Sequence, residues 1–355
     1  MELASQIAQL FYIDSNPESV SAISSGHIND TYLIKTQSEK QYVLQKINRS
    51  VFNDIEGLIA NKVLVSEHLR NSECPYNVVT FLKTYRGDYS FKDDNLDYWM
   101  MMNFIEDSIV HDVPTNKTLV YEAGKLYGDF LIQTSNLDAN KLLETIPNFH
   151  SMPFRYKQFD EALKKAKDEA INLANNEIDL VLKFRKEMHE LSELKANNTF
   201  PIRITHNDAK LSNILFDKND KGLAVIDLDT VMPGIVAYDF GDSIRSICAT
   251  TQEDDNDLLS TGINLQFYES YCKGFAKHTK NLLTEKEIAY LPLGAKTITF
   301  IMGLRFLTDF LNGNIYYKTD YETHNLVRSR NQFRMVQSIK ESFSKMQTIT
   351  IEAFK

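Results

Sequence analysis

Apolar residues in the N-terminal part of the chain come in short runs separated by turn residues, a pattern typical of antiparallel strands. The runs predict strands within residues 20–35, 41–47, 78–82 and 98–102. Apolar residues at helical spacing predict a lead-in helix over 3–13 and an amphipathic helix over 54–71. The N-terminal part is therefore predicted to be a small antiparallel sheet with helices packed on it.

From Pro114 onward the apolar spacing is mainly helical. The predicted helices cover residues 118–134, 159–175, 178–196, 265–275, 285–310 and 322–345. Residues 202–228 interrupt them, because short apolar runs around a turn at 218–222 predict a strand, a loop and a hairpin. At 355 residues the chain exceeds the usual size of a single core. We predict an α+β fold of two lobes, a sheet lobe at 1–104 and a larger, mainly helical lobe at 105–355.

The composition narrows the class of protein. With 43% hydrophobic residues the chain can fill two cores, and a net charge of −9 argues against a nucleic-acid-binding surface, which would be basic. The three cysteines are scattered and lack metal-ligand spacing, as is typical of reduced thiols in the cytosol. The sequence contains neither a transmembrane run nor a recognisable signal peptide. We expect a cytoplasmic monomer or homodimer with no nucleic-acid or membrane partner.

Polar side chains gather at the two outer ends of the predicted hairpin. Asp208 and Asn213 precede its first strand, and Asp227 follows its second strand. Because a hairpin brings its outer ends together, these three side chains are expected to converge although they are distant in sequence. The sequence thus predicts a site built from two carboxylates and one amide.

Such a set suits phosphoryl transfer, which depends on positioning and charge neutralisation more than on covalent chemistry. Mg²⁺ prefers oxygen ligands and keeps several waters, so Asn213 and Asp227 would suffice to hold it beside the phosphates of ATP. Asp208 remains as the catalytic base that takes the proton of the attacking hydroxyl. Protein kinases have the same spacing of five positions between the catalytic Asp and a metal-binding Asn. Lys210, two residues beyond the base, is either a solvated loop lysine or a catalytic contact to the γ-phosphate.

Four motifs carry a family resemblance: His206-Asn207-Asp208, Asn213-Ile214-Leu215, Ile226-Asp227-Leu228-Asp229 and Tyr238-Asp239-Phe240-Gly241-Asp242. Together they resemble the aminoglycoside phosphotransferase and choline kinase superfamily, small-molecule kinases with a protein-kinase-like fold. Residues 26–32, 42–45, 303–307, 314–316 and 324–328 resemble the bacterial N-acetylhexosamine 1-kinases. This resemblance, which covers nearly the whole chain, implies ATP-dependent phosphorylation of the anomeric hydroxyl of an N-acetylhexosamine in carbohydrate metabolism.

The first turn of the sheet lobe holds one glycine, Gly26, where protein kinases have a glycine-rich loop; on spacing alone it is a hairpin turn. The resemblance implies that backbone amides of Ser25 and Gly26 reach the phosphates and that His27 faces the sugar. Gln45 stands where protein kinases carry a phosphate-binding lysine, and we assign it to the nucleotide site. Lys46 points to the opposite face of the strand, so it cannot simply replace that lysine.

The segment that should join the lobes is expected to offer its backbone at Met102 and Phe104 to adenine, although a methionine run is more often core. Strand alternation would place Asp229 on the same side as Asp227, as a second metal contact or a sugar ligand. Thr230 follows and is expected to hydrogen-bond the sugar.

Arg305 lies among apolar residues, and because an unpaired buried charge is costly it must be paired or reach a cleft. A pair with Asp309, one helical turn later, is the simple alternative. The resemblance implies instead that Arg305 and Tyr316 contact the hexosamine. It also implies that Asp239 is structural and holds the catalytic loop by hydrogen bonds.

Two other functions stay open. One is a kinase of another small hydroxylated molecule, such as an aminoglycoside, choline, homoserine or methylthioribose, although Arg305 argues against a cationic substrate. The other is a pseudokinase scaffold that binds nucleotide. The absence of a lysine at Gln45 favours the scaffold, and the intact set of Asp208, Asn213 and Asp227 argues against it.

Overall fold

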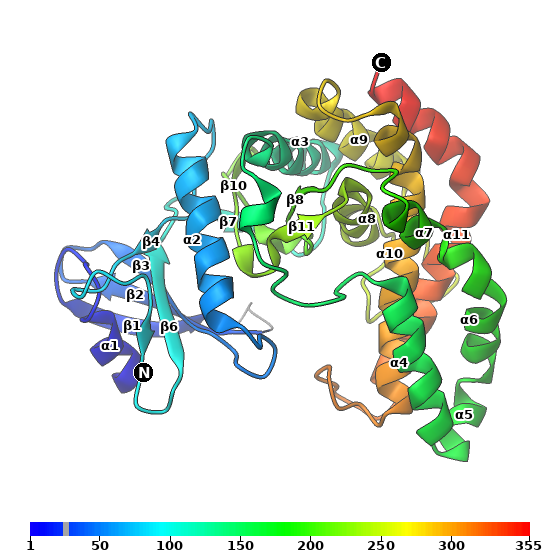
Figure 1. Cartoon of the computed structure of the whole chain (residues 1–355), viewed down its shortest axis with the longest axis horizontal. Helices are drawn as coiled ribbons and strands as arrows, with labels where there is room; N and C mark the ends of the chain where they lie inside the picture. The colour runs from blue at the N-terminus through cyan, green and yellow to red at the C-terminus, as the bar shows by residue number, and fades with distance from the viewer. Residues whose placement is uncertain (24–27) are drawn as a thin grey trace. The chain divides into compact units, whose positions relative to one another are not determined.

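The computed structural model describes residues 1–23 and 28–355 of the chain (Figure 1). The described chain forms two compact units. Unit 1 comprises Met1–Ile109, Gln133–Pro147 and Leu215–Pro233, and unit 2 comprises Val110–Ile132, Asn148–Ile214 and Gly234–Lys355. Each unit is thus built from segments that are distant in sequence. The boundary between residues 104 and 105 stays a prediction.

Unit 1 contains an antiparallel six-stranded sheet. Its strands are β1 (Pro17–Ile23), β2 (Asp30–Thr36), β3 (Gln41–Lys46), β4 (Phe81–Leu82), β5 (Phe91–Lys92) and β6 (Tyr98–Asn103). Their order is β1-β2-β3-β6-β4, with β5 on β6. The register places Gln45 of β3 between Thr31 of β2 and Met100 of β6. Position 45 therefore lies in the middle of the sheet.

Each face of this sheet is covered by one helix. Helix α1 (Glu2–Ala8) packs on the face that carries Leu44 and Met101, which are fully buried. Helix α2 (Ile55–Asn71) packs Leu58 against Met100 on the other face. Because neighbouring strand residues point to opposite faces, β6 supplies methionine to both cores. The methionine run is core at these two positions.

Strand β4 is shorter than the predicted run 78–82. The side chain of Asn103 accepts the N–H of Thr80 at 2.7 Å and donates to the carbonyl of Val78 at 3.3 Å. A side chain thereby takes the hydrogen bonds that a strand ladder would otherwise make. This competition limits β4 to Phe81–Leu82.

The predicted hairpin is present as β9 (Ile214–Phe216) and β10 (Gly222–Val225), which pair with each other. Its turn is closed by Asp217, whose side chain accepts the backbone N–H groups of Asn219 at 2.7 Å and Lys221 at 3.0 Å. Short strands β7 (Ile109–Val110), β8 (Arg203–Thr205) and β11 (Met232–Gly234) complete the list of strands. The hairpin ends at Val225, two positions before Asp227.

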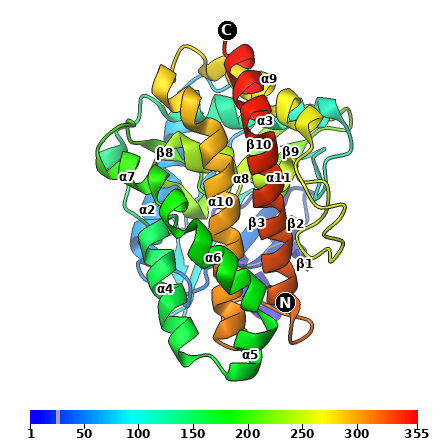
Figure 2. The ribbon, with the colours of Figure 1, turned by 90° about the vertical axis from the view of Figure 1, so that its right-hand side faces the viewer.

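Unit 2 is mainly helical (Figure 2). Its helices are α3 (Lys117–Thr134, which ends in unit 1), α4 (Met152–Lys165), α5 (Asp168–Leu173), α6 (Asn175–Met188), α7 (Glu190–Ala196), α8 (Val236–Ile247), α9 (Leu265–Thr279), α10 (Glu285–Leu311) and α11 (His324–Ala353). The long helices α10 and α11 run side by side, and α4 and α6 pack on them through one apolar core. No helix among the described residues is long and apolar enough to span a membrane.

Two predicted helices, 159–175 and 178–196, are wrong in their boundaries, because four shorter helices occupy that stretch. The first begins at Met152, where the side chain of Ser151 accepts the N–H of Phe154 and a proline lies in the first turn. A serine cap followed by proline is a strong helix start that the charge pattern of the later residues hides.

Helix α8 crosses α10 at two glycines. A Cβ atom added to Gly241 would lie 2.4 Å from the carbonyl oxygen of Gly294, and one added to Gly294 would lie 2.0 Å from that of Ala237. Any larger side chain would force the backbones apart. The close crossing fixes α8, the helix that carries Asp239.

Candidate active site

The loop between β8 and β9 belongs to unit 2 up to Ile214 and is held by α8. The carboxylate of Asp239 accepts the backbone N–H groups of His206 and Asn207, each at 2.6 Å. Asn207 has φ of +62°, a left-handed conformation that asparagine tolerates better than most residues. Two charge-assisted hydrogen bonds thus fix the strained start of the loop, in the structural role expected of Asp239.

Asp208, Lys210 and Asn213 come together at the centre of this loop. Lys210 Nζ lies 2.8 Å from Asp208 Oδ2, and Asn213 Nδ2 donates to the same oxygen at 2.9 Å. Burial would raise the pKa of Asp208, but Lys210 outweighs it, and the pKa falls to about 2. Asp208 is therefore an ionised acceptor at neutral pH, as a base for a hydroxyl proton requires.

Aromatic residues support the loop from beneath. The ring of His206 is fully buried and packs edge-on against Tyr127 and Phe130, with centroids 5.7 and 5.8 Å away. Tyr127 donates its hydroxyl to the carbonyl of Lys210 at 2.8 Å, and Ser243 donates to that of Ala209 at 2.7 Å. His206 thus serves the packing of the loop.

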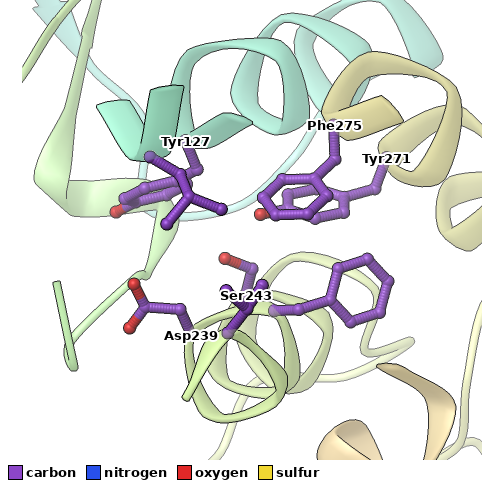
Figure 3. A pocket seen from close by; sticks show the side chains of 8 residues that line it. Tyr127, Asp239, Ser243, Tyr271 and Phe275 are labelled. Atoms are coloured by element: carbon purple, nitrogen blue, oxygen red, sulfur yellow. The ribbon is translucent and has the colours of Figure 1, made fainter. Parts of the chain in front are cut away.

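A small cavity lies between α3, α8 and α9 (Figure 3). Asp239 and Ser243 of α8 face Tyr127, Tyr271 and Phe275 across it. Its volume is about 10 Å³, which is room for one water at most. The cavity is too small for any substrate and belongs to the support of the loop.

In unit 1, Asp227 follows β10 in the left-handed region, with φ of +60°, and is exposed. Residues Leu228–Thr230 then form a 3₁₀ turn. The expectation that strand alternation puts Asp229 beside Asp227 is therefore wrong, because neither residue lies on the strand. Asp227 is on the surface of its unit, whereas Asp229 and Thr230 are 3% and 4% exposed.

The carboxylate of Asp229 is enclosed by protein donors. Lys62 of α2 donates to one oxygen, and Asn29 donates to the other. The hydroxyl of Thr145 donates to its backbone carbonyl at 3.3 Å. Lys62 also donates to Gln45 Oε1 at 3.0 Å. Gln45, the predicted nucleotide residue, is thus joined to Asp229 through a lysine.

Of the other residues predicted to bind the nucleotide, two lie outside the described part of the chain and one lies in a strand. Ser25 and Gly26, with the predicted sugar ligand His27, lie outside the described residues. Met102 pairs in β6, with Val43 and Phe81 as register partners.

Phe104 follows β6 and is half-buried, and its backbone has no hydrogen-bond partner within the described part of the chain. An open backbone N–H and C=O at Phe104 is what an adenine edge would require.

Arg305 is ringed by aromatic residues in unit 2. Its guanidinium carbon lies 5.4 Å from the ring centres of Phe149 and Tyr317 and 5.8 Å from that of Tyr316. It forms no ion pair with the described carboxylates; its hydrogen bond goes to the sulfur of Met302. Arg305 and Tyr316 are thus brought together as expected.

The alternative pairing of Arg305 with Asp309 is absent. Asp309 instead accepts the backbone N–H groups of Ile315, Tyr316 and Tyr317 at 2.9 to 3.0 Å. A buried carboxylate that caps three amides fixes the loop which carries the two tyrosines. Asp309 therefore shapes the surroundings of Arg305 without neutralising its charge.

Sequence reasoning missed His150 and Arg155 in this region. His150 Nε2 bonds the carbonyl of Asn207 at 3.2 Å, and Arg155 donates to the carbonyl of Phe149 at 2.6 Å. Burial, with Arg305 nearby, lowers the pKa of His150 to about 3 and that of Arg155 to about 10. His150 precedes α4 and Arg155 lies in its first turns, whereas the predicted helix began only at residue 159. The helical pattern therefore did not include either residue.

Three buried polar atoms here lack a hydrogen-bond partner among the described residues: His150 Nδ1, Arg155 Nε and Tyr317 Oη. Because His150 is neutral and Nε2 donates to a carbonyl, Nδ1 is an acceptor. These three side chains therefore offer one acceptor, on His150, and two donors, on Arg155 and Tyr317. Phe149 contacts His150 and Arg155, and Arg305 lies between the rings of Phe149 and Tyr317. Buried polar atoms of this kind can be satisfied by an ordered water, an ion or a ligand.

The neutral state of His150 gives a pH-dependent prediction. The folded protein binds this proton only near pH 3, whereas an ordinary histidine binds it near 6.5. Stability from this group is therefore complete above pH 6.5 and falls as the pH drops toward 3. Between pH 7.5 and 5.0 the free energy of unfolding of wild type should fall by about 2 kcal/mol more than that of His150→Gln. Urea titrations at both pH values measure this; equal losses would contradict the assignment.

Similar solved structures identify the fold. A microcompartment-associated aminopropanol kinase has a TM-score of 0.64 at 17% identity, over 98% of both chains. An amicoumacin kinase solved with AMP-PNP and Ca²⁺ has 0.63 at 14% identity, over 94% of this chain and 92% of its own. A spectinomycin phosphotransferase solved with ADP and spectinomycin has 0.61 at 11%, over 98% of both chains.

The fold is thus the two-lobe α+β fold of small-molecule kinases, and the predicted fold class is confirmed. A model of the phosphotransferase enzyme family matches residues 19–271. The chain belongs to this family, and the prediction that it is a phosphotransferase is confirmed.

Proposed function

We propose that this phosphotransferase transfers the γ-phosphoryl group of ATP, with Mg²⁺, to the anomeric hydroxyl of an N-acetylhexosamine. The observation that carries the proposal is the ionised Asp208, held by Lys210 and Asn213 in a loop that Asp239 fixes. The choice of sugar rests on the resemblance to N-acetylhexosamine 1-kinases and on the surroundings of Arg305. Related folds solved with AMP-PNP and ADP support a nucleotide as donor.

Asp208 orients the attacking hydroxyl by accepting its hydrogen bond, and it takes the proton as the new P–O bond forms. Its low pKa means that the proton moves only as the hydroxyl oxygen loses electron density to phosphorus. When that proton arrives, the ion pair between Asp208 and Lys210 weakens, and Lys210 helps to neutralise the transferred phosphoryl oxygens. The chain's own contribution is therefore orientation and charge, with no covalent intermediate.

We assign Asn213 and Asp227 to magnesium, because each side chain carries an oxygen of the kind that this ion prefers. Both N–H groups available on Asn213 face Asp208, since Nδ2 donates to its carbonyl and carboxylate at 2.9 Å. The amide oxygen is left for a cation, and Asp227 adds an exposed carboxylate. Mg²⁺ takes one or two protein oxygens and completes its shell with phosphates and water. Bound there, it would neutralise charge on the phosphate oxygens. That Asn213 and Asp227 share one ion remains part of the proposal.

The acceptor subsite is proposed around Arg305, Tyr316 and the three unpartnered atoms of His150, Arg155 and Tyr317. A neutral sugar with several hydroxyls and an amide carbonyl matches one acceptor and several donors. Two arginines without carboxylate partners disfavour a cationic substrate, such as choline, through charge repulsion. Asp229 was expected to be a second metal contact or a sugar ligand, and Thr230 to bind the sugar. Both are nearly enclosed, so we place neither at the centre of the acceptor subsite.

A substrate panel tests the proposal. N-acetylglucosamine, N-acetylgalactosamine, aminopropanol, choline and an aminoglycoside are each incubated with labelled ATP, and phosphorus NMR locates the phosphate in the product. We expect an anomeric phosphate on an N-acetylhexosamine and no turnover of choline. Phosphate on any other hydroxyl, or transfer to the cationic acceptors alone, would refute the sugar assignment.

Arg305→Met gives a second test, since methionine keeps the apolar bulk beside Phe149 and the tyrosines. Loss of a charged hydrogen bond to the acceptor should lower kcat/KM for the sugar about 10- to 100-fold while the KM for ATP is unchanged. Arg334→Met, on the same unit and in a long, weak pair with Glu341 at 3.7 Å, is the control. An unchanged kcat/KM for the sugar in Arg305→Met would remove this residue from the subsite.

A further inference from the structure

The ammonium group of Lys62 is enclosed in unit 1. Lys62 lies on α2 and is 2% exposed. Its Nζ donates to Gln45 Oε1 at 3.0 Å and to the carboxylate of Asp229, and it lies 5.5 Å from the ring centre of Phe81. A lysine ammonium has three N–H donors, so the described residues accept two of them. The third N–H has no acceptor oxygen among the described residues.

The position of Lys62 is unusual for a helix of this kind. It follows Leu58 by one turn and precedes Val65 and Leu69, so it lies on the apolar stripe that faces the sheet. A buried charge costs several kcal/mol unless it is paired, which makes an accidental lysine there costly. The pair with Asp229 meets that cost.

Gln45 connects this lysine to the nucleotide site. It occupies the β3 position at which protein kinases carry the lysine that holds the α- and β-phosphates. Lys46, next on the strand, points the other way and pairs with Asp30 at 2.9 Å. The lysine ammonium group beside Gln45 is therefore that of Lys62, which lies on helix α2 and not on strand β3.

The same ammonium group also reaches the segment predicted to hold metal and phosphate. Asp229, its partner, comes two residues after Asp227. The other oxygen of Asp229 is held by Asn29, whose Oδ1 accepts the N–H of Asn48 at 2.9 Å. A single charge thus joins α2, β3 and the turn that follows Asp227.

We propose that Lys62 is the phosphate-binding cation of this enzyme. The third N–H of its ammonium group donates to a phosphate oxygen of a nucleoside di- or triphosphate, while Gln45 and Asp229 hold the group in place. The proposal rests on the proposed use of a nucleotide and is independent of which acceptor is phosphorylated. It also answers the pseudokinase alternative, because the lysine absent from β3 is supplied by α2.

Nucleotide binding without metal tests the role of Lys62 directly. The Kd values of ADP and adenosine are measured by calorimetry in EDTA for wild type, Lys62→Met and Lys46→Met. We expect Lys62→Met to weaken ADP about 10- to 100-fold and to leave adenosine unchanged, since only ADP carries phosphates. Lys46→Met, the neighbouring lysine on the opposite face, should match wild type for both ligands.

Exchanging the residues at positions 45 and 62 tests whether ADP affinity can be restored. Gln45→Lys combined with Lys62→Gln returns the ammonium group to the strand and leaves an amide on the helix. This double variant should recover most of the ADP affinity that Lys62→Gln alone loses. If Lys62 were only structural, the double variant would not regain affinity for ADP while its affinity for adenosine stays the same.

Lys62→Met leaves the carboxylate of Asp229 buried without its partner and risks unfolding. Lys62→Met/Asp229→Asn leaves no buried carboxylate without its partner, and its Kd for ADP is compared with that of Asp229→Asn at a temperature at which both variants are folded. If this pair binds ADP equally, the proposal for Lys62 is overturned while the proposed function stands. If wild type binds neither ADP nor ATP, the proposed function itself fails.

Discussion

Asp208→Asn should lower kcat for phosphoryl transfer about 100- to 10,000-fold, the range that a positioned general base supplies. Asparagine keeps the shape of the side chain but cannot take the hydroxyl proton, so KM for ATP and for the acceptor should change little. Lys210 would lose the partner that lies 2.8 Å away, and the variant should be only slightly less stable.

Coupled assays of transfer and calorimetric titrations of nucleotide and sugar separate these effects. Asp94→Asn, an exposed aspartate outside the site, controls for the same chemical change. Near-normal turnover in Asp208→Asn would show that another group accepts the proton. Loss of both binding and turnover would indicate that Asp208 is needed to assemble the site.

Asp239→Ala should destabilise the protein by about 2 to 6 kcal/mol, because it leaves two buried backbone N–H groups without an acceptor. Those groups belong to His206 and Asn207, which are 0% and 4% exposed. Burial raises the pKa of Asp239 to about 6, but it still accepts both bonds when ionised. Transfer should fall with stability, since the loop that carries Asp208 loses its fixed start.

Urea denaturation of Asp239→Ala and Asp239→Asn measures the effect. Asparagine can accept one of the two N–H groups, so it should recover part of the lost stability. A free energy of unfolding within 1 kcal/mol of wild type for the alanine variant, on the order of one hydrogen bond, would contradict the anchoring role. Activity is then compared at a temperature at which every variant is folded.

Long periodic patterns and local chemistry made the fold class predictable. The short runs at 41–47 and 98–102, bounded by turn residues, predicted strands, and α10 follows from apolar residues that continue over many turns. The spacing of Asp208 and Asn213 was informative because five residues span one loop whose geometry is set locally. The structure brings these two side chains together as that spacing indicated.

Contacts between distant segments could not be predicted in the same way. Lys62 and Asp229 are 167 positions apart, and neither sequence neighbourhood indicates the other. His150 reaches the loop of Asp208 from a segment whose helix start depends on one serine and one proline. A charged residue on the apolar stripe of 54–71 was the available signal, and it indicated burial of Lys62 without naming a partner.

By itself, the sequence determined the longer strands, the long helices and the residue types of the catalytic loop, because hydrophobic periodicity and short-range hydrogen bonding act within a few residues. Tertiary structure decided which charges meet. In the described chain Asp229 is buried, Lys62 donates a hydrogen bond to Gln45, and Arg305 forms no ion pair with a carboxylate. The physical reason is that burial of a charge is tolerated only where folding brings its partner, and that partner is chosen by packing across the whole unit.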